Sequence, residues 1–373
     1  MIKMSKLYVA MVVMDEEEHI EGALDSVSDI AERIIVVDTG STDSTVSIVG
    51  KNSRCRLFER PWPGSYGTGR NLPIRIIREK FTQDPRDHIL SLDGDEILSR
   101  QDAIPKALES ETSDGYYLMK NHLVPGGWFG HRSLKLFRNR PELEYVGKIC
   151  ELLEPRIDQI GGRTSCIETT INDFGFMKEQ QHVMKKIQKY VGMLKDKVSA
   201  KNDAVDHIYL SYFLALAGEY QKSIDWLDKV KDPNIRIGAN FQKACILYQM
   251  EEFDHSESII DTMIDNGCDP FTLSEMHNKK GQIESRRKNL DNARQEYCSA
   301  IELNPERDVC WFNHAALGYV IEERVDDETI SNLTCLNPIV SGLSFVPIQH
   351  SLNTFNELDE NYIGLQNLLD GAK

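Results

Sequence analysis

The chain has 373 residues, of which 40% are hydrophobic, and a formal net charge of −16. This length and apolar content are enough for about two domains with buried cores. The negative charge opposes loose binding to nucleic acid or anionic lipid, so nucleic acid is a disfavoured partner. No transmembrane segment is expected, because no apolar stretch reaches the roughly 18 to 20 residues that a bilayer span requires.

The N-terminal residues and the cysteines indicate the cellular location to be expected. Residues 1–6 lead directly into an apolar run and lack the separate apolar region and small-residue cleavage site of a signal peptide. The eight cysteines are scattered without C-x-x-C pairs, which indicates neither a zinc site nor a disulfide framework. We expect a cytoplasmic protein whose cysteines are mostly reduced and buried.

Three apolar runs in the first part of the chain end in acidic residues. Residues 7–13 are followed by an acidic segment, 14–18, and a helix to about Ser28. Residues 34–37 end at Asp38, and residues 88–92 end at Asp93. Continuous apolar runs predict strands buried on both faces of a parallel sheet, and ligands bind at the carboxyl ends of such strands. The sequence therefore predicts a site where these carboxylates meet.

The Asp93–Gly94–Asp95 triplet is the candidate metal motif. A tight turn at Gly94 lets both carboxylates face one hard divalent cation, which also holds phosphate oxygens. This chemistry suits a nucleotide diphosphate with Mn²⁺ or Mg²⁺, and the alternative is a solvated turn. Asp43 and Thr45 fit the cap of a helix that begins near Thr42.

Beyond about residue 175 the pattern changes to amphipathic helices with short polar turns. Small residues recur there at spacings of 33, 37 and 34, close to the 34-residue tetratricopeptide period. They are Ser211, Ala244, Gly281 and Ala315, and the second helices are expected to open at Tyr220, Phe253 and Leu290. An ordinary helical bundle is the alternative. The predicted domains are 1–178, a repeat domain over 179–325, and a cap or tail over 326–373.

Five segments between about residues 6 and 180 resemble, in order, a family 2 glycosyltransferase of the GT-A fold. They are MVVMDEEEHIEGALDSV, IIVVDTGSTDST, PWPGSYGTGRN, LSLDGDE and RSLKLFRNRPELEYVGKICE. The resemblance implies an α/β GT-A domain with a Rossmann-like mixed sheet, here followed by an all-α tetratricopeptide-like domain. It also implies inverting, metal-dependent transfer of a sugar from a nucleotide-diphosphate donor, with a UDP-sugar as first choice.

The resemblance also implies the donor site. The predicted nucleotide-binding residues are Asp15, Glu17, Asp38, Arg70, Asp93, Arg132 and Arg138, with Glu16 as an alternative to Asp15 or Glu17. The base and ribose are expected at the first two strand ends, and the two later arginines at the diphosphate. A helix N-cap is the alternative for Asp38, and a salt bridge within the domain is the alternative for Arg70. Lys135 lies between apolar residues on the predicted polar face of the strand that carries Arg132 and Arg138.

The metal and the general base follow from the same resemblance. Asp95 is expected to coordinate the cation directly, and Asp93 to reach the ribose or the metal through water. Glu151 ends a segment similar to Gly-x-Val-His-Glu and is the candidate base, with a salt-bridged loop carboxylate as the alternative. The chain departs from the family at Cys150, which replaces the motif's His, and at Asp173, which replaces a later His and becomes the third candidate metal ligand.

The acceptor side is less defined. Glu96 is a candidate acceptor contact or partner of a backbone amide, and Trp128 is a candidate sugar platform or packing anchor. The acceptor is a peptide, protein or glycan, and the helical repeats favour a polypeptide and allow a homo-oligomer. An inactive GT-A scaffold is the alternative function, motivated by Cys150 and Asp173. A sugar nucleotidyltransferase would need a glycine-rich loop after the first strand, which residues 14–18 lack, and the acidic charge opposes modification of DNA bases.

Overall fold

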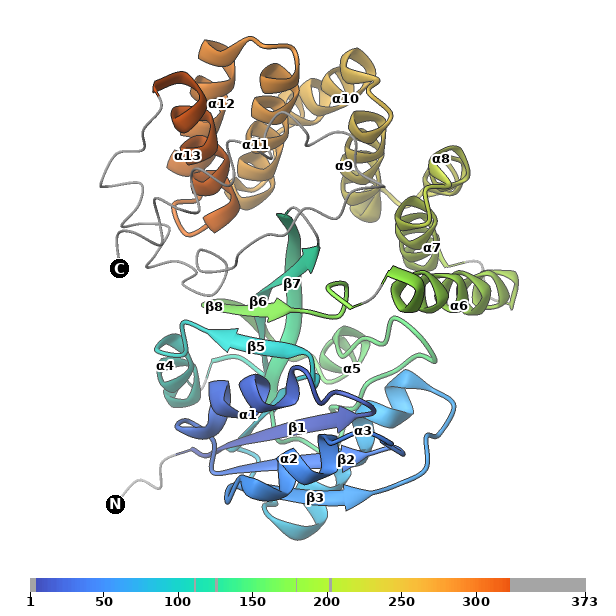
Figure 1. Cartoon of the computed structure of the whole chain (residues 1–373), viewed down its shortest axis with the longest axis vertical. Coiled ribbons are helices and arrows are strands. Elements are labelled where there is room, and N and C mark those ends of the chain that lie inside the picture. Colours follow the sequence, from blue (N-terminus) through green and yellow to red (C-terminus); the bar gives the residue numbers. More distant parts are fainter. Residues whose placement is uncertain (1–4, 111, 125–126, 179, 201–202, 323–373) are drawn as a thin grey trace. The chain divides into compact units, whose positions relative to one another are not determined.

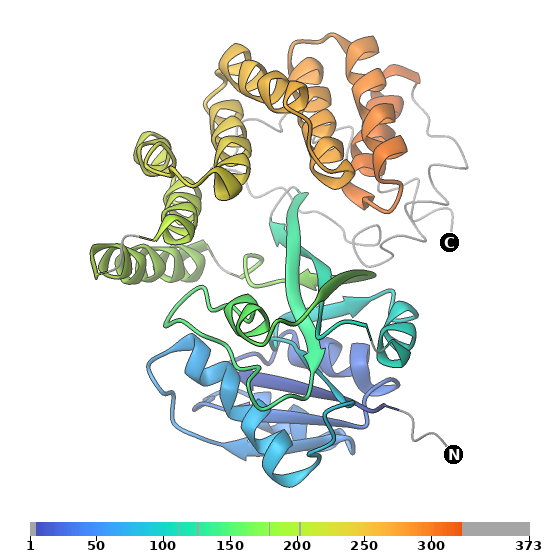
Figure 2. The ribbon, with the colours of Figure 1, turned by 180° about the vertical axis from the view of Figure 1, so that it is seen from behind.

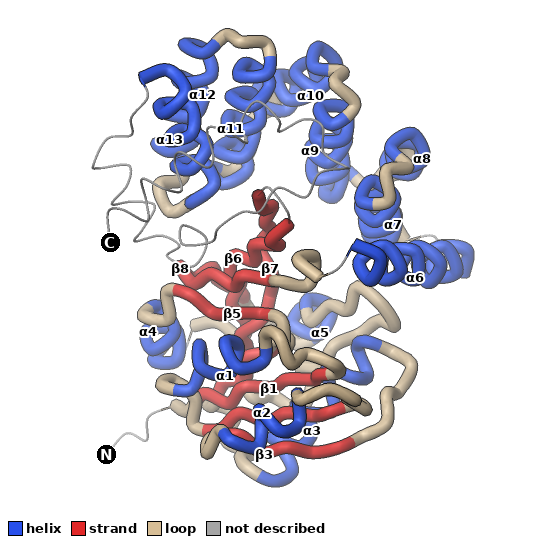
Figure 3. The backbone as a smooth tube through the Cα atoms, in the orientation of Figure 1, coloured by secondary structure: helices blue, strands red, loops and turns tan. Residues whose placement is uncertain are grey.

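A computed structural model describes residues 5–110, 112–124, 127–178, 180–200 and 203–322. The chain divides into two compact units, Met1–Lys178 and Glu179–Lys373. All the described strands belong to the first unit, and the described part of the second unit is helical (Figure 3). The tail expected over 326–373 lies outside the described residues.

The first unit is built on a mixed sheet with the strand order β3-β2-β1-β4-β7-β6-β8-β5. Four parallel strands form one half: β1 (Leu7–Val13), β2 (Arg33–Asp38), β3 (Cys55–Glu59) and β4 (His88–Ser91). The other half contains β5 (Glu96–Ser99), β6 (Gly115–Val124), β7 (Gly127–Arg138) and β8 (Thr164–Asp173). β7 runs antiparallel to both β4 and β6, so it joins the two halves.

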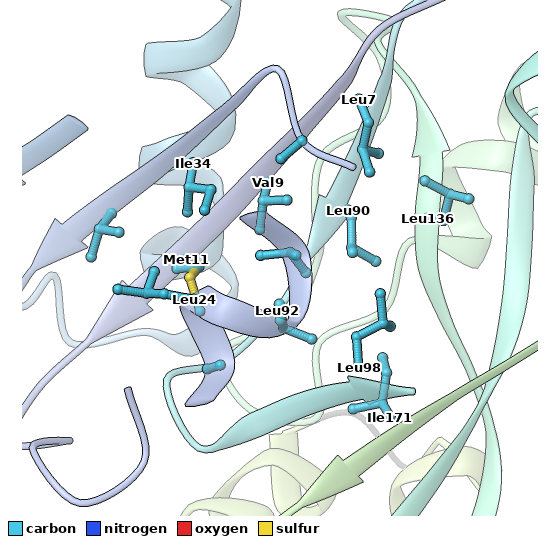
Figure 4. Packing of buried hydrophobic residues seen from close by; sticks show 14 of the residues in the cluster. Leu7, Val9, Met11, Leu24, Ile34, Leu90, Leu92, Leu98, Leu136 and Ile171 are labelled. Atoms are coloured by element: carbon cyan, nitrogen blue, oxygen red, sulfur yellow. The ribbon is translucent and has the colours of Figure 1, made fainter. Parts of the chain in front are cut away.

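Helices cover both faces of the sheet, which explains the continuous apolar runs. Alternate residues of β1 point to opposite sides: Val9 and Met11 pack with Leu24, whereas Tyr8 and Ala10 pack with Ile74 (Figure 4 shows the first cluster). The first face carries α1 (Ile20–Ser28), α2 (Thr45–Lys51) and α4 (Ala103–Glu109) (Figure 1). The opposite face carries α3 (Tyr66–Lys80) and α5 (Glu154–Gln159) (Figure 2).

The parallel pairing brings the predicted strand ends to one edge. Val13 at the end of β1 lies opposite Asp38 at the end of β2, and Ala10 lies opposite Ser91 at the end of β4. The loops that follow these strands are therefore neighbours, as the sequence pattern predicts.

The second unit is a series of helices joined by short turns. They are α6 (Gln180–Ala200), α7 (Ala204–Leu216), α8 (Tyr220–Leu227), α9 (Pro233–Gln249), α10 (Phe253–Asp265), α11 (Pro270–Arg286), α12 (Leu290–Leu303) and α13 (Asp308–Glu322). Tyr220, Phe253 and Leu290 open the second helix of successive pairs, as predicted. The residue two positions before each opening has a positive φ: 77° at Gly218, 63° at Glu251 and 64° at Lys288.

The small residues mark a repeated helix crossing. The Ser223 hydroxyl donates to the Ser211 carbonyl at 2.6 Å, and twelve residues likewise separate Ser256 from Ala244, whose carbonyl accepts at 2.8 Å. In the third pair, a Cβ added at Gly281 would lie 2.5 Å from the Tyr297 ring. The same close approach thus recurs from pair to pair, which is the packing of a tetratricopeptide-like stack.

The cysteine expectation is only partly met. Among the described residues no disulfide forms, but only Cys55 and Cys310 are buried, while Cys166 and Cys298 are exposed. None of the helices in the described ranges combines the length and apolar character needed to cross a lipid bilayer.

Candidate active site

The loops after β1 and β2 form a hydrogen-bonded rim at the carboxyl edge of the sheet. The Asp15 carboxylate accepts from the Thr42 amide at 2.7 Å, and the Glu17 carboxylate accepts from the Ser44 amide at 2.9 Å. In return the Glu17 amide donates to the Asp43 carboxylate at 3.0 Å. These contacts place both predicted carboxylates on the rim and give each a local structural role as well.

Asp38 lies between these loops and shapes its own turn. Its carboxylate accepts from the amides of Gly40 at 3.0 Å and Ser41 at 3.2 Å, and its side chain is buried. This is an Asx turn, not the helix N-cap considered from the sequence. The following helix begins at Thr45 instead of near Thr42, and the Thr45 amide donates to Asp43 at 2.9 Å.

Arg70 joins two of the predicted site carboxylates. One guanidinium nitrogen lies 2.6 Å from Asp93 Oδ2, a second binds Asp93 Oδ1, and Nε donates to Glu151. Burial opposes the charge of Arg70, yet the two carboxylates raise its pKa well above the ordinary value. Burial raises the pKa of Asp93, but this effect is outweighed by three nearby cations, Arg70, Lys135 and Lys120, which hold the pKa far below the usual range. The alternative considered for Arg70 from the sequence, a salt bridge within the domain, is therefore observed in this structure.

The arrangement of Arg70 and Glu151 depends on a close contact between α3 and the loop 147–151. The Tyr66 amide donates to the Lys148 carbonyl at 2.9 Å, and a Cβ on Gly67 would lie 2.4 Å from the Gly147 carbonyl oxygen. The loop itself contains two residues with positive φ, Gly147 at 110° and Cys150 at 49°. Glycine at 67 and 147 therefore allows the helix and the loop to meet, which brings Glu151 to Arg70.

Two lysines that the sequence analysis did not assign to the site lie beneath it. Lys135 Nζ is 3.0 Å from both carboxylate oxygens of Glu96 and 3.7 Å from Asp93 Oδ2. Lys120 Nζ is 2.5 Å from Glu96 and 2.7 Å from Asp173. Both lysines are buried, so Lys135 does not lie on a polar strand face. The sequence feature that could have identified Lys135 as a buried site residue is its position between two apolar residues of a strand, Leu134 and Leu136.

Glu96 has a different environment from the one predicted. Its side chain is 0% exposed, and one oxygen also accepts from the Asp93 amide at 2.9 Å. The predicted contact with an acceptor is wrong for this structure because two lysines and a backbone amide enclose the carboxylate. The alternative partner, a neighbouring backbone amide, is observed.

Asp173 does not fit the third metal-ligand role. It lies opposite Glu96 in the β5–β8 pairing, and it contacts Lys120 at 2.7 Å and His122 Nδ1 at 2.8 Å. Burial disfavours its charge, but Lys120 and His122 hold its pKa well below the ordinary range. Among the described residues, no three His, Cys, Asp or Glu side chains form a cluster that could hold a metal.

The Asp93–Gly94–Asp95 turn does fit a cation that is shared with a ligand. It directly follows β4, and a Cβ on Gly94 would lie 2.9 Å from Glu16 Cγ, so glycine lets the turn pack against the rim. One or two carboxylates with phosphate oxygens are a usual ligand set for Mg²⁺. The candidate ligands are therefore reduced to Asp93 and Asp95.

Arg138 does not converge with this group. Arg138 pairs with His88 at the start of β4, whereas Asp93 follows the end of that strand. The Arg138 side chain donates to the carbonyls of Ser113 at 2.9 Å and Ser110 at 2.7 Å, so its predicted diphosphate contact is wrong. Arg132 lies opposite Met119, and alternation along β6 places it on the face opposite to Lys120. Trp128 lies on β7, and its side chain is outside the described part.

Known proteins share sequence similarity with this chain. A "TPR repeat-containing protein" of Synechococcus elongatus is 29% identical over 153 residues, which are 40% of this chain and 36% of that protein. An "uncharacterized glycosyltransferase" of Rickettsia bellii is 34% identical over 113 residues, 30% of this chain and 35% of that protein. The chain thus spans about a third of each relative.

A solved structure of MamA from Desulfovibrio magneticus aligns with a TM-score of 0.33 and 15% identity, covering 43% of this chain and 92% of that one. The model of the family described as "Glycosyl transferase family 2" matches residues 8–160. Residues 8–160 of this chain are therefore a glycosyl transferase family 2 domain.

Proposed function

We propose that this protein is an inverting glycosyltransferase that uses a nucleotide-diphosphate sugar and a divalent cation. The observation that carries the proposal is the convergence of Asp93, Arg70 and Glu151 at the carboxyl edge of the sheet. The family 2 match over residues 8–160 supports the reaction class. A UDP-sugar is the proposed donor, and the rim carboxylates Asp15, Glu17 and Asp38 form the proposed nucleotide subsite.

The charges of the site support a cation. Ion pairs join five carboxylates, Glu16, Asp93, Glu96, Glu151 and Asp173, to four cations, Arg70, Lys120, Lys135 and Lys178. Asp95 and Glu18 add negative charge near Lys178, so negative charge exceeds positive charge in this group, which favours the binding of Mn²⁺ or Mg²⁺. A bound divalent cation would act as a Lewis acid that stabilises the leaving diphosphate, and Asp93 and Asp95 would hold it.

In the proposed reaction Glu151 is the general base. It takes the proton from an acceptor hydroxyl as that oxygen attacks the anomeric carbon, and a single carboxylate is sufficient for inversion. Arg70 now holds Glu151, so the base must be released before it can act. The donor diphosphate offers Arg70 a competing bidentate partner. Cys150 beside the base supplies no proton chemistry in this scheme.

The acceptor is proposed to be a peptide or protein, with a glycan as the alternative. The second unit is a stack of helix pairs, an architecture suited to extended chains and to assembly into homo-oligomers. Glycosyl transfer to a polypeptide within the cytoplasm is the proposed setting. Polypeptide recognition rests on architecture alone and is independent of the proposal for donor binding.

One observation favours a second candidate, a scaffold without activity. Arg70 engages both Asp93 and Glu151, so two of the proposed catalytic carboxylates already have a cationic partner. If no ligand displaced Arg70, the domain would be a closed, inactive GT-A module.

Thermal unfolding with nucleotides decides between the two. Wild type, Asp95→Asn and the exposed control Asp25→Asn are melted with UDP, GDP, CMP or dTDP, each with and without Mn²⁺ or Mg²⁺. The transferase proposal expects a rise with one nucleotide that requires the metal, persists in the control and disappears in Asp95→Asn. A rise that is independent of metal would overturn the cation role, and no rise with any pair would support the scaffold.

A further inference from the structure

Asp93 has a second cationic neighbour besides Arg70. Lys135 Nζ lies 3.7 Å from Asp93 Oδ2, while Arg70 binds both oxygens of the same carboxylate. Under the proposed function, on which this inference rests, Arg70 turns toward the donor diphosphate. Lys135 can then keep the Asp93 side chain in place, because its own position does not depend on Arg70.

Glu96 sets the position of Lys135 and of the Asp93 backbone together. Both Glu96 oxygens lie 3.0 Å from Lys135 Nζ, and Oε2 also accepts from the Asp93 amide at 2.9 Å. Lys120 holds the same carboxylate at 2.5 Å and links it to Asp173. One buried carboxylate thus fixes the backbone of Asp93 and places an ammonium group beside its side chain.

A β-bulge delivers Lys135 to this position. Tyr116 pairs with Leu136 and Tyr117 pairs with Leu134, so Lys135 is the extra residue of β7. A bulge redirects a side chain and is common beside active sites. In a regular strand, consecutive residues point to opposite faces of the sheet. Because of the bulge, Lys135, which contacts Glu96, and Leu136, which packs in the core cluster, lie on the same face.

The burial of this network argues against a purely stabilising purpose. Glu96 is 0% and Lys135 5% exposed, and buried ion pairs of this kind seldom stabilise more than apolar residues of similar size would. We propose that Lys135, held by Glu96, is the positioning residue that fixes Asp93 for donor binding. Lys135 acts through Asp93 and does not touch the donor.

A double-mutant cycle tests this indirect action. UDP affinity in the presence of Mn²⁺ is measured by calorimetry for wild type, Lys135→Met, Asp93→Asn and the double variant, with the exposed Lys106→Met as control. We expect Lys135→Met to weaken binding about tenfold in the wild-type background and less than about twofold in the Asp93→Asn background. Lys135→Arg should recover most of the affinity. Equal losses in both backgrounds, or no loss in either, would overturn the inference.

A charge-balanced double variant serves as the control for correct folding. Lys135→Met combined with Glu96→Gln removes one charge of each sign, keeps an acceptor for the Asp93 amide and should melt near wild type while still binding UDP weakly. If wild type binds none of the four nucleotides, the proposed function has failed, and the cycle is read from melting temperatures without ligand. The inference then requires Lys135→Met to lower the melting temperature less in the Asp93→Asn background than in wild type. If the decreases in melting temperature of the two single variants simply add in the double variant, the inference is overturned.

Discussion

Arg70 donates from Nε to Glu151 while its other guanidinium nitrogens hold Asp93. The side chains are largely buried, with 17% of Arg70, 11% of Glu151 and 21% of Asp93 exposed. The candidate base and the first acidic residue of the metal motif therefore share one cation. Any ligand that draws Arg70 away alters both.

Replacing Arg70 by Lys should disable this connection. A lysine has no planar fork and cannot bind Asp93 in a bidentate manner while also reaching Glu151. We expect kcat/KM for the donor to fall by about 100-fold, measured by nucleotide release. Arg75→Lys is the matched control, because Arg75 lies on the same helix and forms a half-exposed pair with Glu144. Similar losses in both variants would contradict the role of Arg70.

Glu151→Gln should separate chemistry from donor binding. The amide keeps the size of the side chain but cannot accept the acceptor's proton, so kcat should fall about 100-fold or more. The melting shift with nucleotide and metal should persist, because Glu151 is not a proposed donor ligand. An unchanged kcat would show that another group is the base.

Gly94→Ala should disturb the metal motif by steric overlap. The added Cβ would lie 2.9 Å from Glu16 Cγ and 3.1 Å from Val13 Cγ1. We expect a loss of about 1–3 kcal/mol in the free energy of unfolding and a smaller melting shift with nucleotide and metal. Gly50→Ala is the control: nothing lies within 4 Å of its added Cβ, so it should be neutral or slightly stabilising. Equal behaviour of the two variants would refute the close packing of the turn.

His88 should make the first unit less stable in mild acid. Its side chain is 0% exposed, and burial together with Arg138 lowers its pKa to about 4. Because the folded-state pKa lies below the unfolded value of about 6.5, the stabilisation is present above pH 6.5 and is lost as pH falls toward 4. The loss reaches at most about 3 kcal/mol. Urea unfolding between pH 7.5 and 4.5 should show a steeper decline for wild type than for His88→Gln, and parallel declines would exclude His88 as the cause.

Gly281→Ala should destabilise the helix stack. Its Cβ would overlap the Tyr297 ring, 2.5 Å away, so α11 and α12 must separate. We expect a cost of about 1–3 kcal/mol, measured by thermal unfolding, and partial recovery on adding Tyr297→Leu. Gly192→Ala, which meets nothing within 4 Å, should have little effect. No recovery in the double variant would argue against the Gly281–Tyr297 contact as the cause.

The sequence by itself determined the first parallel strands, the helical character of the second unit and the edge of the sheet where the candidate site lies. Apolar runs that end at Asp38 and Asp93 specify parallel strands, and parallel pairing requires their carboxyl ends to be adjacent. The repeat positions were equally readable, because a helix crossing that recurs at a fixed spacing needs a small residue at each crossing, as at Ser211, Ala244 and Gly281. The site roles of the rim and base carboxylates remain proposals.

Only the tertiary structure decided which charges meet. Arg138 is six residues from Arg132 and was grouped with it, but β7 runs antiparallel to β4, so its end lies at the start of that strand, away from Asp93. Lys135 reaches Glu96 through a bulge, and Asp173 meets Lys120 through the β6–β8 pairing. Local spacing fixes the period of a strand, but strand direction, bulges and the partner of a buried charge depend on contacts between residues far apart in the chain, where the cost of an unpaired charge selects the partner.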